Sequence, residues 1–149
     1  MSPVIATVIL VAVAITVAVA VAYWMSGIAG QYTKFEKVEI QTAYSTRVAG
    51  GWDVSMEIKN TGSAASTIIR AFVNDVPINS TYYGQSTIVA NETACDFPYT
   101  TGLTIDSGDA ATIMIYISDT YRNLSSGTTV NIKLHSAGGM DYIKLVELV

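Results

Sequence analysis

Side chains able to carry out covalent or metal chemistry are few in this chain of 149 residues. His135 is the single histidine and Cys95 the single cysteine, which excludes a zinc cluster built from several such ligands. A lone cysteine is more often a buried apolar side chain than a nucleophile. Ser136 follows His135, but no serine lies in the Gly-x-Ser-x-Gly pattern of a nucleophile elbow. We therefore predict no catalytic residue and expect His135 to be structural or exposed at a strand end.

Motifs that would bind a cation or a phosphate are also weak. Asp106 and Asp109 flank a turn and could together hold a cation. Calcium takes six or more oxygen ligands, so two acids at one turn more often indicate a solvated loop. No glycine-rich phosphate loop occurs in the sequence. The sequence predicts no metal, no cofactor and no enzymatic activity.

Three stretches match the Asn-x-Ser/Thr acceptor of N-glycosylation. They begin at Asn79, Asn91 and Asn123, and all three fall in predicted loops or turns, where an acceptor is accessible. We predict that these asparagines carry sugar, which would shield a surface that has few charges. Chance matches that stay unmodified are the alternative.

Charge divides the chain into two parts. Residues 1–33 contain no Asp, Glu, Lys or Arg, and all 8 basic and 12 acidic side chains follow from Lys34 onward. The net charge of -4 argues against a nucleic-acid partner, which would need a basic face. The sequence therefore predicts an apolar helix over residues 1–34 and a weakly acidic head over residues 35–149.

Residues 4–25 are apolar apart from Thr7 and Thr16, and a helix of about 20 such residues crosses a bilayer. Ser2 followed by Pro3 is typical of a helix start, because Ser can cap and Pro suits the first helical position. Gly27 and Gly30 weaken the helix without ending it. We expect the helix to end between residues 32 and 34, a rod of about 45 Å.

Three fates are open to this helix. It could be a secretory signal, but no positively charged region precedes the apolar run. It could be a permanent single-pass membrane anchor. It could also be stored in the membrane and later packed against copies of itself.

Small residues recur every four positions along the helix. Such spacing lets helix backbones approach closely, although Ala and Val are also simply common in membrane helices. The main row comprises Ala14, Ala18, Ala22, Ser26 and Gly30, and a shorter row comprises Ala12, Thr16 and Ala20. The predicted polymerisation surface comprises Val4, Ile5, Ile9, Leu10, Ala14, Ala18, Ala22, Ser26 and Gly30.

The opening Ser2-Pro3-Val4-Ile5, followed by ATVILVAVAITV, resembles the N-terminal segment of mature archaeal type IV pilins and related adhesion filaments. In that family a short basic leader, the class III signal, is removed by a prepilin peptidase. The resemblance implies that Met1 is the mature first residue, with an uncleaved anchor as the alternative. Bacterial pilins usually carry a Glu near the helix start, where this chain has no acid before Glu36. Archaellins usually lack the Ser-Pro-Val-Ile opening, which favours a pilus over a motility filament.

The pattern changes after the helix from helical to alternating. Trp52, Val54, Met56 and Ile58 alternate with polar residues in the clearest half-buried strand. Further strands are predicted over residues 38–44, 68–73, 76–78, 87–90, 111–117, 130–134 and 142–149. On residues 38–44 we place Val38, Ile40, Thr42 and Tyr44 on one face. The fold prediction is α+β: a long hydrophobic α-helix followed by an all-β, immunoglobulin-like antiparallel sandwich head.

The resemblance implies a structural subunit of an extracellular, archaeal type IV pilus-like filament that serves surface adhesion. The partners it implies are the cytoplasmic membrane before assembly, a pilus assembly ATPase with its membrane platform, and many copies of the same chain. Helices would bundle at the filament centre and heads would form the sheath. The alternatives are a single-pass membrane-anchored surface binding module and a motility archaellin.

Overall fold

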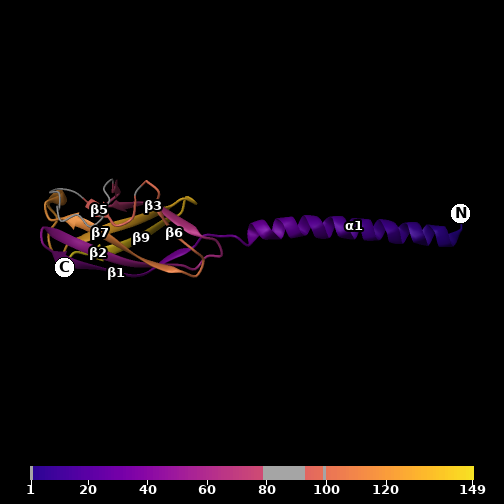
Figure 1. The fold of residues 1–149 in the computed structure, drawn as a ribbon, viewed down its shortest axis with the longest axis horizontal. Coiled ribbons are helices and arrows are strands. Elements are labelled where there is room, and N and C mark those ends of the chain that lie inside the picture. The colour runs from indigo at the N-terminus through magenta and orange to yellow at the C-terminus, as the bar shows by residue number, and fades with distance from the viewer. Residues whose placement is uncertain (1, 79–92, 99) are drawn as a thin grey trace. The chain divides into compact units, whose positions relative to one another are not determined.

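The computed structural model describes residues 2–78, 93–98 and 100–149. The chain divides into two compact units, Met1–Phe35 and Glu36–Val149, the second of which we call the head. The first unit contains the helix α1, Pro3–Tyr32 (Figure 1). Its start at Pro3 and its end at Tyr32 confirm the predicted limits. The two glycines after Met25 are accommodated without a break.

The head is a sandwich of two antiparallel sheets (Figure 1). The first, which we call the β2 sheet, has the strand order β1-β2-β7-β5, and the second, the β8 sheet, has the order β4-β3-β8-β9 with β6 paired to β3. The strands are β1 (Val38–Val48), β2 (Gly51–Asn60), β3 (Ser66–Val73), β4 (Val76–Pro77), β5 (Thr93–Cys95), β6 (Leu103–Ile105), β7 (Ala110–Ser118), β8 (Thr129–Ser136) and β9 (Asp141–Glu147). A short 3₁₀ turn, η1 (Tyr121–Asn123), precedes β8. The predicted α+β class is confirmed.

The core lies between the two sheets. The predicted alternation on β2 is confirmed, because Trp52, Val54, Met56 and Ile58 are all fully or almost fully buried. Isoleucines of β7 fill the same layer, and residues of β8 such as Leu134 face them from the second sheet. Alternating side chains of two inner faces make the core of such a sandwich, so their opposite faces point outward.

The predicted face of β1 is wrong beyond Ile40. The pairing of β1 with β2 shifts its register between Ile40 and Thr42, so one extra residue is inserted there. A bulge of this kind moves every later side chain to the other face. Val38 and Ile40 face the core, but Ala43 replaces Thr42 in that layer and Tyr44 becomes 57% exposed.

Two short strands, β5 and β6, were not predicted from the sequence. β5 pairs with β7, and β6 pairs with β3. Each has three residues, too few to show a period of two in the sequence. The strand predicted over residues 87–90 lies outside the described residues.

The turns follow their sequence signals. Asn74 and Asp75 join β3 to β4 with positive φ values of 50° and 65°, a conformation that Asn and Asp tolerate. At Gly51 an added Cβ would lie 2.2 Å from the carbonyl oxygen of Ile117. A side chain there would push β7 away from β2, so this position requires glycine.

One serine joins the end strands of the two sheets. Ser45 on β1 donates its hydroxyl to the carbonyl of Glu147, at 2.7 Å, and accepts the amide of Val149, at 2.9 Å. β1 and β9 are the last strands of their sheets. The sandwich is thus closed along this side by contacts between residues a hundred positions apart.

Glu36, the first residue of the head, is held by the opposite sheet. Its carboxylate accepts hydrogen bonds from the hydroxyls of Ser66, at 3.3 Å, and Ser136, at 3.2 Å. Gly138 leaves room for it, because a Cβ there would lie 2.6 Å from the nearer Glu36 oxygen. Ser66 and Ser136 are fully buried, so this carboxylate satisfies two hydroxyls that water cannot reach.

Candidate assembly surface

The helix α1 is apolar on all sides and wholly uncovered. No residue of Pro3–Tyr32 is buried, and the most apolar window has a mean hydropathy of 3.0. By length and composition α1 is able to cross a membrane. A helix that is hydrophobic all round is stable when lipid or other protein covers it. The exposed apolar surface of α1 is therefore typical of a helix that lipid or another protein covers.

All nine residues predicted for polymerisation lie on α1 and are exposed. The large ones project far from the helix, with Val4 68% and Leu10 69% exposed. A Cβ added at Gly30 would meet no other atom within 4 Å. The structure brings these residues together on one helix. It holds no second chain, so their role in polymerisation stays a prediction.

The main row of small residues winds around the helix. An α-helix turns by about 100° per residue, so each step of four residues advances about 40° beyond a full turn. From Ala14 to Gly30 the row therefore moves by about 160° around the axis. A parallel, straight neighbour would lose contact with it. A partner helix that crosses α1 at an angle can follow such a row, as in ridge-into-groove packing.

The polar groups inside the apolar run are already satisfied. Thr7 donates its hydroxyl to the carbonyl of Val4, and Thr16 donates to that of Ala12, both at 2.8 Å. Neither hydroxyl needs a partner from water, so both threonines can face lipid or another helix at little cost. The side chain of Ser2 does not cap the helix, whereas its carbonyl accepts the amides of Ile5 and Ala6.

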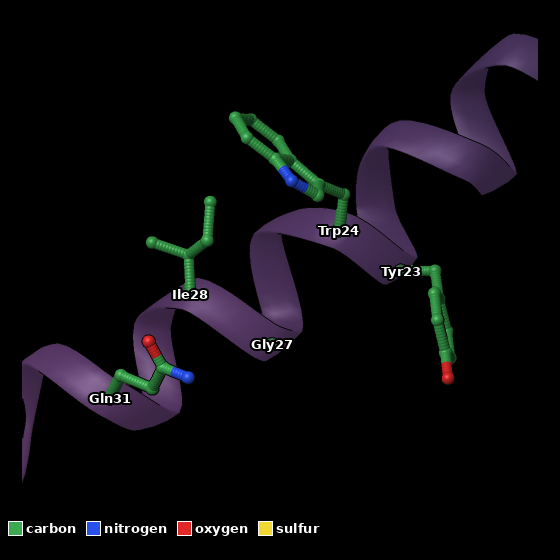
Figure 2. A pocket seen from close by; sticks show the side chains of 5 residues that line it. All are labelled: Tyr23, Trp24, Gly27, Ile28 and Gln31. Atoms are coloured by element: carbon green, nitrogen blue, oxygen red, sulfur yellow. The ribbon is translucent and has the colours of Figure 1, made fainter.

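A feature that the sequence analysis missed lies at the end of the apolar run. Tyr23 and Trp24 are 85% and 66% exposed, and with Gly27, Ile28 and Gln31 they line a shallow pocket. Figure 2 shows Trp24 and Ile28 projecting on one side of the helix and Tyr23 on the other, with the bare Gly27 between them. Aromatic residues of this kind concentrate at membrane–water interfaces. The signal was the aromatic pair near the end of the apolar run, before the first charged residue, Lys34.

Among the described residues, Cys95 lies on β5 of the β2 sheet, whereas His135 and Ser136 lie on β8 of the other sheet. Cys95 is fully buried and its thiol donates to the carbonyl of Phe97. Burial raises the pKa of the Cys95 thiol to about 11, which keeps it protonated and unreactive. His135, near the end of β8, pairs with Asp141 on β9. The adjacent Ser136 bonds Glu36 on the inner side of the sheet.

The turn with two aspartates lies at the surface. Asp106 and Asp109 are exposed between β6 and β7. No group of three or more His, Cys, Asp or Glu side chains that could hold a metal lies within residues 2–78, 93–98 and 100–149.

One of the three predicted acceptor asparagines falls within the described residues. Asn123 is exposed in η1, with a φ of 55°. The hydroxyl of Ser125, the third residue of its motif, lies 3.4 Å from that of Thr128. Asn79 and Asn91 lie outside the described residues.

Comparison with known proteins gives a likeness of fold. No family model and no curated protein matches the chain. The archaellum periplasmic stator protein FlaG from Sulfolobus acidocaldarius is 17% identical with a TM-score of 0.51, over 74% of this chain and 99% of that one. A chain of the archaellum periplasmic stator protein complex of FlaF and FlaG from the same organism is 17% identical with a TM-score of 0.50, over 74% of this chain and 89% of that one. The Iho670 flagellar-like filament is 14% identical over 99% and 98%, with a TM-score of 0.44, too low to support a shared fold. The chain therefore shares the fold of archaellum stator proteins.

Proposed function

We propose that this chain is a non-enzymatic, structural subunit of an archaeal type IV pilus-like filament. The observation that carries the proposal is the helix α1, apolar on every side and without a buried residue. Covering so much apolar surface is worth about 25 cal/mol per Å². Copies of the same helix would supply that cover in an extracellular filament, and lipid would supply it beforehand.

The mechanism follows from the two units. The subunit is stored with α1 across the cytoplasmic membrane and its head outside. An assembly ATPase and a membrane platform, which the N-terminal resemblance implies, move it into the filament. The helices bundle at the centre through the row that includes Ala18, and the heads form a sheath that serves adhesion. Sugar on Asn123, which is exposed, adds solubility to that sheath.

The decisive experiment is electron microscopy, with mass spectrometry, of material sheared from producing cells. Wild type should yield filaments that contain this chain, with α1 in a central bundle and added mass on the Asn123 peptide. Ala18→Glu should abolish filaments, because a carboxylate within a dry bundle is costly. Ala18→Leu keeps α1 apolar but prevents close approach, so it should reduce filament yield at least about tenfold. Ser126→Glu, which adds the same charge to an exposed loop of the head, is the matched control and should assemble normally.

A second candidate is a monomeric surface binding module anchored by α1. The observation in its favour is the fold likeness to a protein described as an archaellum periplasmic stator. An anchor needs apolar character in α1 and no close packing. Under this candidate Ala18→Leu would behave as wild type, and the chain would stay in the membrane fraction without filaments. That result would overturn the filament proposal.

A further inference from the structure

Exposed apolar and acidic side chains gather on the outer face of the β2 sheet. Tyr44 on β1 and Met114 on β7 lie in one row across Ser55 and are 57% and 42% exposed. Asp53 and Glu57 lie on the same face, two residues to either side of Ser55. The face thus has an apolar centre with a carboxylate on each side along β2.

A third carboxylate borders this face. Asp96 follows β5, and its amide bonds the carbonyl of Met114. Burial raises the pKa of both Asp53 and Asp96, so each carboxylate is incompletely hydrated. A cation brought close to either would lower the free energy of its charged form.

The outer face of the β8 sheet has an apolar row and basic groups. Ile143 and Leu145 on β9 are 57% and 65% exposed. Ile143 pairs in register with Lys133, whose ammonium lies 4.8 Å from the centre of the Phe72 ring. Arg70 lies on β3 opposite His135.

The acids near this second face are largely paired, whereas one strong base is not. Asp75 binds Lys133 at 3.0 Å, and Asp141 binds His135. Arg70 is exposed, and no ion pair joins it to another described residue. Glu147 is the remaining acid on β9, at the end far from Arg70. The charge left to a partner around Arg70 is positive.

We propose that, in the filament of the proposed function on which this inference rests, the outer face of the β2 sheet of one head packs on the outer face of the β8 sheet of a second copy. The contact places Tyr44 and Met114 against Ile143 and Leu145. It brings Asp53 and Glu57 toward Arg70 and Lys133. The two surfaces are complementary in both apolar character and charge.

The sandwich fold dictates how this contact propagates. The two outer faces of a sandwich point in opposite directions. A contact between one face and the other is heterologous, so each copy keeps a free face after binding. Such contacts continue from copy to copy, as a filament sheath requires.

The contact is too small to act alone. Each face offers two large exposed apolar residues, far less than the roughly 800 Å² per partner of a stable interface. Tethering the heads through bundled helices raises their effective concentration and makes a weak contact sufficient. The contact between the two outer faces thereby sets the spacing of heads in the filament. It is too weak to pair free subunits before assembly.

Charge exchange on the full chain tests the contact. Asp53→Lys with Glu57→Lys sets bases against bases, and Arg70→Glu with Lys133→Glu sets acids against acids. Each double variant should lower the yield of sheared filaments at least about tenfold, while the head stays resistant to protease. The fourfold variant restores complementarity and should return the yield to within about twofold of wild type. Asp106→Lys with Asp109→Lys, at a turn on neither face, is the matched control and should assemble normally.

A crosslinking measurement reads the geometry directly. Filaments of Met114→Cys with Leu145→Cys, treated with a short bis-maleimide, should give a ladder of covalent multimers. Each single variant should give almost none, and the buried Cys95 should not react. The contact would be overturned if wild type forms filaments and both charge-exchange double variants give a normal yield. It would equally be overturned if filaments of the double cysteine variant give no ladder. Either result leaves the proposed function intact. Absence of wild-type filaments would overturn both.

Discussion

The two units of this chain differ in where their apolar side chains find cover. In the head, Trp52, Ile115 and Leu134 are covered by other residues of the same chain. In α1 the valines of every side are exposed, and so is its one leucine, Leu10. The described part of the head therefore buries a core of its own, whereas the helix leaves its apolar surface exposed. Apolar side chains of the head are thus stabilised by packing within the chain, whereas those of α1 can be covered only by lipid or another molecule.

The largest expected effect is a loss of stability of the head that leaves the helix unchanged. Ile115→Ala should lower the free energy of unfolding of the head by about 2–5 kcal/mol, because Ile115 is fully buried and would leave a cavity. Ile143→Ala removes the same side chain from an exposed position and should change the free energy of unfolding of the head by about 0.5 kcal/mol or less. Urea unfolding in detergent, followed by Trp52 fluorescence in a Trp24→Phe background, measures both. Equal effects of the two variants would contradict the burial of the core described above.

A smaller effect concerns the first residue of the head. Gly138→Ala should cost about 1–2 kcal/mol, because the new methyl group displaces Glu36 and leaves the buried hydroxyls of Ser66 and Ser136 without their acceptor. The φ of Gly138 is not positive, so backbone strain adds nothing.

The control for this prediction is a double-mutant cycle in the same urea assay. Glu36→Ala combined with Gly138→Ala should cost little more than Glu36→Ala alone, because both changes act on one set of hydrogen bonds. Additive costs would mean that the two residues act independently, against the contact between them.

A further effect is a pH dependence confined to the head. The pKa of Cys95 rises from 9.0 in a model thiol to about 11 in the folded chain, chiefly because the thiol is buried. A raised pKa means that the folded state holds the proton more tightly than the unfolded state. The stability this contributes is present below pH 9 and is lost as the pH rises through 11. Urea midpoints of wild type should therefore fall more between pH 9 and 11 than those of Cys95→Ala, and parallel curves would show an accessible thiol.

The sequence predicted local structure well and long-range pairing poorly. The limits of α1 could be read from Pro3 and from the first charged residue, Lys34, and β2 from its strict alternation. The bulge after Ile40 has no sequence signature, since Gln41 and Thr42 suit either face of a strand. β5 and β6 are too short for periodicity, and their strands form because β7 and β3 offer an edge.

The candidate site shows the same limit. Composition alone identified α1 as a surface without a partner in the chain, and the spacing of Ala14, Ala18 and Ala22 predicted how closely a neighbour could approach. The pairing of Glu36 with Ser66 and Ser136 depends on contacts across 30 and 100 residues. The acids and bases of the two outer faces could be assigned only after the registers of the sheets were known.

The hydrogen bonds of Ser45 that join β1 and β9 affect how closely packed heads can interact. Exposed strand edges template pairing with other chains, and heads held at high density are at particular risk of amyloid-like growth. Ser45 ties the long end strands β1 and β9 to each other, while the opposite ends of the sheets, β5 and β4, have only three and two residues. Packed side by side, such heads offer little edge for lateral fusion. In the proposed filament, the hydroxyl of Ser45 would therefore help to keep the sheets of neighbouring heads from joining.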